Sequence, residues 1–295
     1  MGNLLSYEEI ALTDKAYNLK LEDYMFDFRK LNEFVMSHTY SKNCLDTELA
    51  KAIYDSTSKQ VVIYENEELN IPKDGPTTNI IMSKKRSFEA ARSYIGKKIA
   101  VLNFANNHNV GGAPFSAGAQ EESLCRISTL YNCLLYEYRS FYAHHKELYK
   151  EHKINHWGNS DLIYTPDVVV YKSDESAPKM LEKKDWYKVD VITSAAPKLP
   201  YDIGYIEPMD WGAAGLPRLR RVFEIAKKNN VEVLILGAWG CGAFHNPPEA
   251  VALTFKLLLE QYHFETVEFA IYSNEKNNRN YDVFHEIIMN SEKGE

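Results

Sequence analysis

The stretch KIAVLNFANNHNVGGAPFSAGAQEESLCRISTLY, residues 98–131, carries the main signal for the fold of this chain. It begins with a near-continuous apolar run, which is typical of a strand buried on both faces. It ends with Leu124, Ile127 and Tyr131, whose spacing places them on one face of a helix. The glycine-rich loop between them therefore joins the carboxyl end of a strand to the amino end of a helix. Such a junction presents free backbone N–H groups and a positive dipole end, which together suit an anion.

The same alternation of strand and helix signals continues along the chain. Short apolar runs that predict buried strands stand at residues 61–64, 167–174, 189–196, 231–239 and 266–274. Helices are predicted over residues 88–95, with Ser87 as N-cap and Gly96 as stop, over 120–138, over 217–230, with Pro217 at the first helical position, and over 247–262. This order predicts an α/β protein with helices on a mixed, largely parallel sheet, and it places ligands at the carboxyl ends of the strands.

Residues 1–58 differ from the rest, because they are charged and carry helix-favouring residues with scattered apolar positions. We therefore predict two parts: an N-terminal helical extension over residues 1–58, packed on the core, and an α/β domain over residues 59–295. Within that domain, the charged stretch 172–188 is predicted to be a solvent-exposed loop.

The composition argues against several classes of protein. The 295 residues include 41 acidic and 34 basic ones, a net charge of −7, so the chain lacks the basic footprint of direct nucleic-acid binding. No apolar run approaches the roughly 20 residues that span a bilayer, so stable membrane insertion is not expected. The four cysteines show no CxxC spacing, which favours reduced thiols and an intracellular location, cytoplasmic or nuclear.

The first six residues, MGNLLS, fit the M-G-x-x-x-[ST] pattern for N-myristoylation at Gly2. The pattern is short, and a single acyl chain without nearby basic residues anchors a protein only weakly. An ordinary start of the chain is the favoured interpretation.

A second glycine-rich loop, GAWGCGAFHN, follows a later predicted strand. It contains Gly237, Gly240 and Gly242, and a Pro-Pro pair opens the next helix, so this loop too can direct backbone amides at a phosphate. Neither loop has the G-x-x-x-x-G-K-[ST] pattern, and His245 occupies the third glycine position of the dinucleotide fingerprint G-x-G-x-x-G. Two lysine-free loops at one sheet edge suit a diphosphate flanked by two sugars. Phe244 either stacks on a ring of that ligand or closes the protein core.

These segments resemble one known family. The stretches VLNFANNHNVGGAPFSAGAQEESLCRISTLY, YTPDVVVYKSD, VDVITSAAP and VLILGAWGCGAFHNPPEAVA are similar, in this order, to the microbial-type poly(ADP-ribose) glycohydrolases. The resemblance implies a three-layer macrodomain-like fold and hydrolysis of the O-glycosidic ribose–ribose bond of the polymer, which releases ADP-ribose. It implies no cofactor and no metal. Residues 59–295 would then be an ADP-ribose-binding catalytic domain whose partner is ADP-ribose or poly(ADP-ribose), free or attached to protein.

The resemblance also assigns roles by position. The family pattern is three glycines, a spacer and Q-E-E, in which the second glutamate is catalytic and the first holds the ribose beside it. Here these residues are Glu122, as general acid and base, and Glu121; because adjacent helical residues point about 100° apart, we predict both at the entry turn of their helix. The implied substrate-binding residues are Asn106, Gly111, Gly112, Ala113 and Gln120, followed by Gly240, Cys241, Gly242, Ala243 and Phe244 in the diphosphate loop.

The chain departs from the family pattern at one position. Ala113, followed by Pro114, stands where the family has a third glycine. An alanine with positive φ costs on the order of 1 kcal/mol, and a residue before proline favours an extended backbone. Two alternatives therefore stay open: a module that binds ADP-ribose without cleaving it, and a hydrolase that removes mono-ADP-ribose from protein or nucleic acid.

Other reactive side chains give weaker signals. His144, His145, His152 and His156 are predicted to lie on a solvated helical face; the last two have the i, i+4 spacing that can share a metal, but no HExxH pattern is present. Cys125 follows the Q-E-E motif closely and is predicted to be a buried structural thiol.

Overall fold

The computed structural model describes residues 14–155, 157–200, 208–273 and 278–290 of the chain. Within these residues, a sheet of seven strands has the order β1-β4-β5-β3-β6-β7-β2. Neighbours from β5 to β2 run parallel, whereas β4 is antiparallel to both β1 and β5, so the predicted mixed, largely parallel sheet is confirmed. The strands are β1 (Val61–Ile63), β2 (Ile80–Ser83), β3 (Ile99–Phe104), β4 (Leu162–Val170), β5 (Tyr187–Ser194), β6 (Val233–Leu236) and β7 (Thr266–Ala270).

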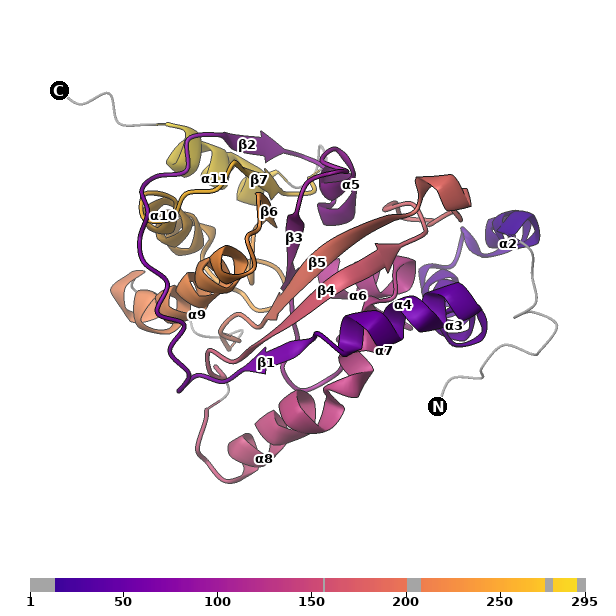
Figure 1. Ribbon diagram of the computed structural model, residues 1–295, viewed down its shortest axis with the longest axis horizontal. Helices are drawn as coiled ribbons and strands as arrows, with labels where there is room; N and C mark the ends of the chain where they lie inside the picture. Colours follow the sequence, from indigo (N-terminus) through magenta and orange to yellow (C-terminus); the bar gives the residue numbers. More distant parts are fainter. Residues whose placement is uncertain (1–13, 156, 201–207, 274–277, 291–295) are drawn as a thin grey trace.

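Helices cover both faces of this sheet and give three layers (Figure 1). The helices of one face are α9 (Pro208–Lys228), α10 (Pro248–Leu259) and α11 (Arg279–Met289). Those of the other are α5 (Ser87–Arg92), α6 (Gln120–Ile127), α7 (Leu130–Tyr136), the π-helix η2 (Tyr138–Ala143) and α8 (His144–Lys150). The N-terminal helices are α2 (Asp14–Leu21), the short η1 (Glu22–Tyr24), α3 (Phe28–Leu45) and α4 (Thr47–Thr57), and a further short helix, η3 (Lys183–Asp185), precedes β5.

Side chains of the central strands alternate between two apolar cores. In β3, Ala100 and Leu102 belong to the core under α9 and α10, whereas Ile99 and Val101 belong to the core under α5 and α6. Because both faces are covered, the strands read as apolar runs in the sequence. A third cluster, which includes Val35, packs α2, α3 and α4 on β4. The division of the chain at residue 58 stays a prediction.

Most predicted strands are confirmed within a few residues, but one predicted helix begins earlier than expected and another is interrupted. Helix α9 begins at Pro208, and Pro217 lies inside it rather than at its start. The predicted helix over 120–138 is broken into α6 and α7. Ser128 has an extended backbone there and pairs with Val170 at the end of β4, so the neighbouring strand interrupts a segment with helical periodicity.

Two further differences concern the segment before β3. Strand β2 was not predicted, because its apolar run, IIMS, is short. In the structure this strand pairs with the buried strand β7. Helix α5 begins at Ser87 with Arg86 as its N-cap, and it ends at Arg92, before Gly96. This places Arg86 directly after β2, at the edge of the sheet.

The charged stretch 172–188 is not simply an exposed loop. Lys172 is fully buried, and its ammonium nitrogen donates hydrogen bonds to the Val35 carbonyl oxygen at 3.2 Å and to Thr39 Oγ1 at 2.6 Å. The same nitrogen lies 4.6 Å from the ring centroid of Tyr17. Lys172 therefore joins α2 and α3 to the end of β4. Burial lowers its pKa well below the ordinary value for lysine.

The histidine-rich segment also differs from the prediction at one residue. His145 is fully buried rather than solvated. Its Nδ1 lies 2.7 Å from the Phe141 carbonyl oxygen, and its Nε2 lies 3.2 Å from a carboxylate oxygen of Asp161. It is therefore a core ion-pair residue, whereas His152 is exposed and His156 lies outside the described residues.

The myristoylation motif at Gly2 also lies outside the described residues. Among the helices that the structure describes, none is both long enough and apolar enough to cross a membrane. Myristoylation and the intracellular location stay predictions.

Substitution of the buried Lys172 is expected to change the pH dependence of stability. Its pKa is lower in the folded chain than in the unfolded one, so between the two values the unfolded chain binds more protons. The free energy of unfolding of the wild type should therefore rise with pH towards about 10, the ordinary lysine range. Lys172→Met should flatten this rise, as measured by urea unfolding from pH 7 to pH 10. Lys188→Met, which removes an exposed lysine of β5, is the control; parallel curves for wild type and Lys172→Met would contradict the prediction.

Candidate functional site

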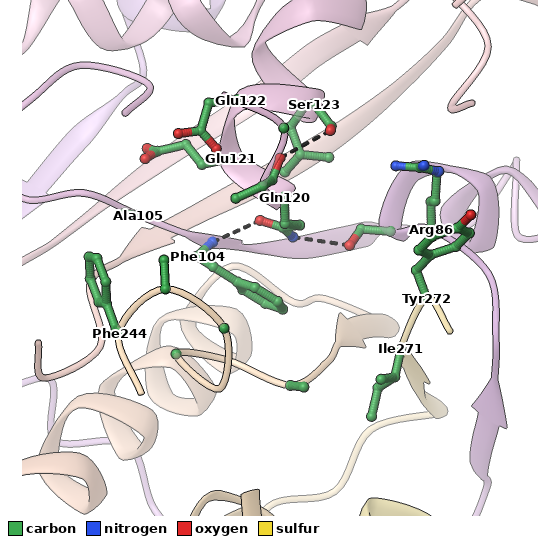
Figure 2. Close-up of a pocket in the computed structure, with 18 of the residues that line it drawn as sticks. Arg86, Phe104, Ala105, Gln120, Glu121, Glu122, Ser123, Phe244, Ile271 and Tyr272 are labelled. Atoms are coloured by element: carbon green, nitrogen blue, oxygen red, sulfur yellow. Dashed lines mark hydrogen bonds between the residues drawn. The ribbon is translucent and has the colours of Figure 1, made fainter. Parts of the chain in front are cut away.

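A cavity of about 340 Å³ opens at the carboxyl ends of β3, β6 and β7, and its size falls in the range of small-molecule sites. Two loops bound it: the first glycine loop, residues 105–119, and the second glycine loop, residues 237–246. Figure 2 shows the two glutamates on one wall, Phe244 at one end, and Arg86 with Tyr272 at the other. The lining residues are 86, 87, 104–106, 118–124, 174, 196, 238, 240, 242–244, 270–272 and 280.

The two glutamates lie in the first turn of α6, as predicted, and both line the cavity. Glu121 is 3% exposed, and its carboxylate accepts hydrogen bonds from Asn103 Nδ2 at 3.2 Å and from the Asn106 N–H at 2.7 Å. Glu122 is 8% exposed, and its Oε1 accepts a hydrogen bond from the Ala113 N–H at 3.1 Å. Glu121 is therefore fixed to the end of β3, and Glu122 to the first glycine loop.

Burial acts on the protonation of Glu121. It raises the pKa of the Glu121 carboxyl well above the ordinary range, and the charge of Glu122 adds to this, while the N–H donors act in the opposite direction. A raised pKa keeps the proton on the Glu121 carboxyl group to higher pH, which suits acid–base chemistry. The adjacent Cys125 is buried, as predicted, and burial raises the pKa of its thiol, so it is not an activated nucleophile.

Gly111 and Gly112 let the first glycine loop pass directly behind the glutamates. Their φ angles are +64° and +68°, in the left-handed region that favours glycine. A Cβ atom on Gly111 would lie 2.9 Å from Cys125 Sγ, and one on Gly112 would overlap the Glu122 carboxyl group. Both conformation and space therefore require glycine at these positions.

Ala113 does not have the strain expected of an alanine at the third glycine position. It is not among the described non-glycine residues with positive φ. Its carbonyl oxygen accepts hydrogen bonds from the N–H groups of Ser116 and Ala117, at 3.0 Å and 2.8 Å, which close a turn. Its own N–H is left to bind Glu122. Although Ala113 departs from the family pattern, its N–H group still donates a hydrogen bond to the Glu122 carboxyl group.

The side chain of Gln120 bonds to protein groups in three directions. Its Oε1 accepts a hydrogen bond from the Phe104 N–H at 2.9 Å, and its Nε2 donates to Ser87 Oγ at 3.0 Å and to the Leu102 carbonyl oxygen at 2.8 Å (Figure 2). It therefore joins the start of α6 to β3 and α5, and this fixes the direction in which the two glutamates project.

The second glycine loop is held by the buried side chain of Asn246, which the sequence analysis missed. Its Nδ2 donates to the carbonyl oxygens of Pro197, Gly240 and Phe244, at 2.8 Å, 3.0 Å and 3.2 Å. Its Oδ1 accepts a hydrogen bond from Trp211 Nε1 at 2.6 Å. An asparagine directly before a Pro-Pro pair and a helix is the signal that could have identified it.

Three consecutive residues of this loop, Gly242, Ala243 and Phe244, line the cavity. Among the residues that the structure describes, no acceptor is assigned to the N–H groups of Gly242, Ala243 and Phe244. The ring of Phe244 is half-buried, and helix α10 begins directly after the loop, at Pro248. Free amides beside the positive end of a helix are suited to a phosphate group.

The far end of the cavity is formed by residues that the sequence analysis missed. The Arg86 guanidinium carbon lies 4.2 Å from the ring centroid of Tyr272 (Figure 2). Asp174 accepts hydrogen bonds from the N–H groups of Phe88 and Glu89, at 2.9 Å and 3.3 Å, and burial raises its pKa. These residues escaped prediction because β2, which leads to Arg86, was not recognised and because Asp174 lies in the stretch predicted to be exposed.

The structure brings most of the predicted site residues to one cavity. Those that line it are Asn106, Gln120, Glu121, Glu122, Gly240, Gly242, Ala243 and Phe244. The other predicted residues, Gly111, Gly112, Ala113 and Cys241, do not line it; the first three lie behind the glutamates, and the last packs against the core. Among the described residues, no group of three His, Cys, Asp or Glu side chains is placed to hold a metal ion.

A family model and several solved structures match this chain. The model described as the microbial-type PARG catalytic domain, where PARG is poly(ADP-ribose) glycohydrolase, matches residues 31–173. PARG from Thermomonospora curvata bound to the inhibitor ADP-HPD is 28% identical with a TM-score of 0.74, and the match covers 86% of this chain and 98% of that one. PARG from Deinococcus radiodurans in complex with ADP-ribose is 30% identical with a TM-score of 0.67, covering 80% and 96%. No curated protein is similar enough to count as a match.

The three-layer fold, with its ligand cavity at the carboxyl ends of parallel strands and a pair of buried carboxyl groups, defines a macrodomain-like protein. Within that class, the chain belongs to the microbial-type poly(ADP-ribose) glycohydrolase family. The resemblance seen in the sequence is thereby confirmed. The family model begins at residue 31, inside α3, so it includes part of the segment assigned to the N-terminal extension.

Replacement of Gly112 is expected to destabilise the protein. Gly112→Ala forces a side chain into a left-handed backbone, at a cost of about 1–2 kcal/mol, and also displaces the Glu122 carboxyl. Gly242→Ala, in the second glycine loop, is the control, because a Cβ there meets nothing within 4 Å and should change stability by less than about 0.5 kcal/mol. Urea unfolding measures both; equal losses for the two variants would show that Gly112 is not constrained.

Proposed function

We propose that this chain is a poly(ADP-ribose) glycohydrolase, which hydrolyses the ribose–ribose bond of the polymer and releases ADP-ribose. The observation that carries the proposal is the position of Glu122, a buried carboxyl group on the wall of a cavity that also presents the free amides of the second glycine loop. Membership of the family and the solved relatives, one bound to ADP-ribose and one to ADP-HPD, support the same activity.

In this proposal ADP-ribose lies in the cavity in one direction. The diphosphate binds the N–H groups of Gly242, Ala243 and Phe244, which supply hydrogen bonds without a fixed cation. The terminal ribose lies against the glutamates and Asn106. The adenine ring then extends towards Tyr272, where an aromatic side chain oriented by a guanidinium provides a surface for stacking.

Glu122 performs the acid and base steps. Protonated, it donates a proton to the ribose oxygen of the departing unit as the bond from that oxygen to the anomeric carbon breaks. The resulting carboxylate stabilises the oxocarbenium-like carbon and accepts a proton from the water that attacks it, so the enzyme returns to its starting state. The Ala113 N–H keeps the carboxyl group in place through both steps.

Glu121 has a different role because its carboxyl group is already held by two protein donors, from Asn103 and Asn106. It orients the ribose hydroxyl groups beside Glu122, as the family pattern implies.

The chemical nature of the conjugate separates this proposal from its alternatives. Purified polymer, ADP-ribosylated protein and ADP-ribosylated oligonucleotide should be offered to the wild type, and released ADP-ribose measured. Preferential release from polymer supports the proposal, and preferential release from either mono-ADP-ribosylated substrate would replace it with a mono-ADP-ribosyl hydrolase. ADP-ribose binding by calorimetry without any release would indicate a binding module.

Glu122→Gln is expected to reduce polymer hydrolysis by about 10³-fold, since the amide neither donates a proton to the leaving oxygen nor activates water. The Kd for ADP-ribose should stay within about threefold, because the amide has nearly the shape of the carboxyl group. Glu260→Gln, at an exposed carboxyl group beyond α10, is the control. Hydrolysis by Glu122→Gln at the wild-type rate would remove Glu122 from the mechanism.

Tyr272→Ala is expected to weaken ADP-ribose binding by about tenfold, since base stacking on an aromatic ring contributes about 1–3 kcal/mol. Ribose 5-phosphate, which has no adenine ring, should bind wild type and variant equally. Tyr136→Ala, which removes an exposed tyrosine of α7, is the control for both ligands. Equal loss of affinity for the two ligands would place the adenine ring elsewhere.

A further inference from the structure

One face of α3 packs along the chain segment that carries the glutamates. Phe28, Asn32, Thr39 and Asn43 are spaced by 4, 7 and 4 residues, so they lie along one face of the helix. Each contacts the first glycine loop or the segment from α6 into α7. None of the four lines the cavity. Helix α3 therefore lies behind the site and not in it.

The contacts reach both ends of α6. At its start, Phe28 packs on Gly118, where a Cβ atom would overlap the phenylalanine ring. At its end, the Thr39 hydroxyl donates to the Arg126 carbonyl oxygen, one of the terminal carbonyls that an α-helix cannot satisfy internally. Helix α3 thus supports an eight-residue helix that is too short to be stable alone.

Asn32 reaches the turn that presents Ala113 to the glutamate. It is 3% exposed, and its Nδ2 donates to the carbonyl oxygens of Ser116 and Ala117, at 3.3 Å and 3.2 Å. Because the Ser116 and Ala117 amides bind Ala113 in turn, the position of Asn32 is transmitted to the Ala113 backbone. The Ala113 N–H is the group that binds Glu122.

Arg126 holds the same turn through other carbonyl groups. It is 4% exposed, and its Nη1 donates to the carbonyl oxygens of Pro114 and Ala117, at 2.9 Å and 2.6 Å. Burial lowers its pKa to about 10, so the guanidinium stays charged at neutral pH. Together, Asn32 and Arg126 bind the carbonyl groups of residues 114, 116 and 117.

We propose that Asn32 is a positioning residue for Glu122: with Arg126, it fixes the 113–117 turn so that the Ala113 N–H is directed at the Glu122 carboxyl group. This inference rests on the proposed hydrolase function. It also gives α3 a part in catalysis, although the helix contributes no residue to the cavity wall. Small losses of alignment at a reacting group lower turnover more than they lower ground-state binding.

The test compares Asn32→Leu, which keeps the number and branching of the side-chain heavy atoms and loses the donors, with Glu33→Ala, an exposed neighbour on the same helix. Asn32→Leu should lower kcat by about tenfold and change KM by less than about threefold. Amides of residues 113–123 should exchange hydrogen faster in this variant. Asn32→Gln, which retains a donor amide, should recover part of the lost kcat.

Two outcomes would overturn the inference: faster exchange with unchanged kcat, or lower kcat with unchanged exchange of residues 113–123. If Asn32→Leu does not fold, Arg126→Lys tests the same turn, because a lysine keeps the charge and loses the planar guanidinium, whose Nη1 binds the Pro114 and Ala117 carbonyl oxygens while its Nη2 binds Ser123 Oγ. If the wild type hydrolyses no substrate, the proposed function fails. In that case hydrogen exchange alone tests whether Asn32 holds the turn. Unchanged exchange in Asn32→Leu would reject this role of Asn32 as well.

Discussion

Two adjacent carboxyl groups, those of Glu121 and Glu122, are buried at the start of α6, and much of the surrounding structure serves to keep them there. Burial of a charged group is costly unless donors or a proton compensate. Here the donors are backbone and side-chain N–H groups, the space comes from consecutive glycines, and the helix start contributes its dipole. The same burial raises the pKa of Glu121, so one arrangement serves both the packing of the site and acid–base chemistry.

Different layers of the fold hold the two glutamates in place. The sheet ends hold Glu121 through the backbone after β3, and Gln120 joins that strand end to α5. The N-terminal helices support the opposite side, through the face of α3 and through the buried amine of Lys172. A segment that looks like an appendage in the sequence thus lies within contact of the site, and the family model begins inside its longest described helix.

The sequence predicted those parts of the fold and site that depend on local pattern. Apolar runs marked the buried strands, and a glycine loop between a strand and a helix marked the position of the glutamates. Features that depend on contacts between distant residues were missed. Asp174 meets an α5 amide 86 residues away, Asn246 binds a carbonyl 49 residues away, and Ser128 leaves its helix to meet β4.

The third glycine position shows the same limit at a single residue. Composition and the family pattern predicted a strained Ala113, because they describe the residue type but not the path of the chain. In the structure the left-handed conformations end at Gly112, and the turn after Ala113 needs only ordinary backbone angles from it. The substitution is therefore accommodated by where the turn begins.

Among the described residues that line the cavity, Arg86 is the single formally cationic side chain, and it lies at the end away from the glutamates (Figure 2). Attraction by fixed charge grows with the number of phosphates a nucleotide carries, whereas a set of amides saturates once its hydrogen bonds are made. Abundant cellular triphosphates therefore gain little from their extra charge in this cleft. Recognition of the ligand in this cleft then depends on its length and on its second sugar, which an ordinary mononucleotide lacks.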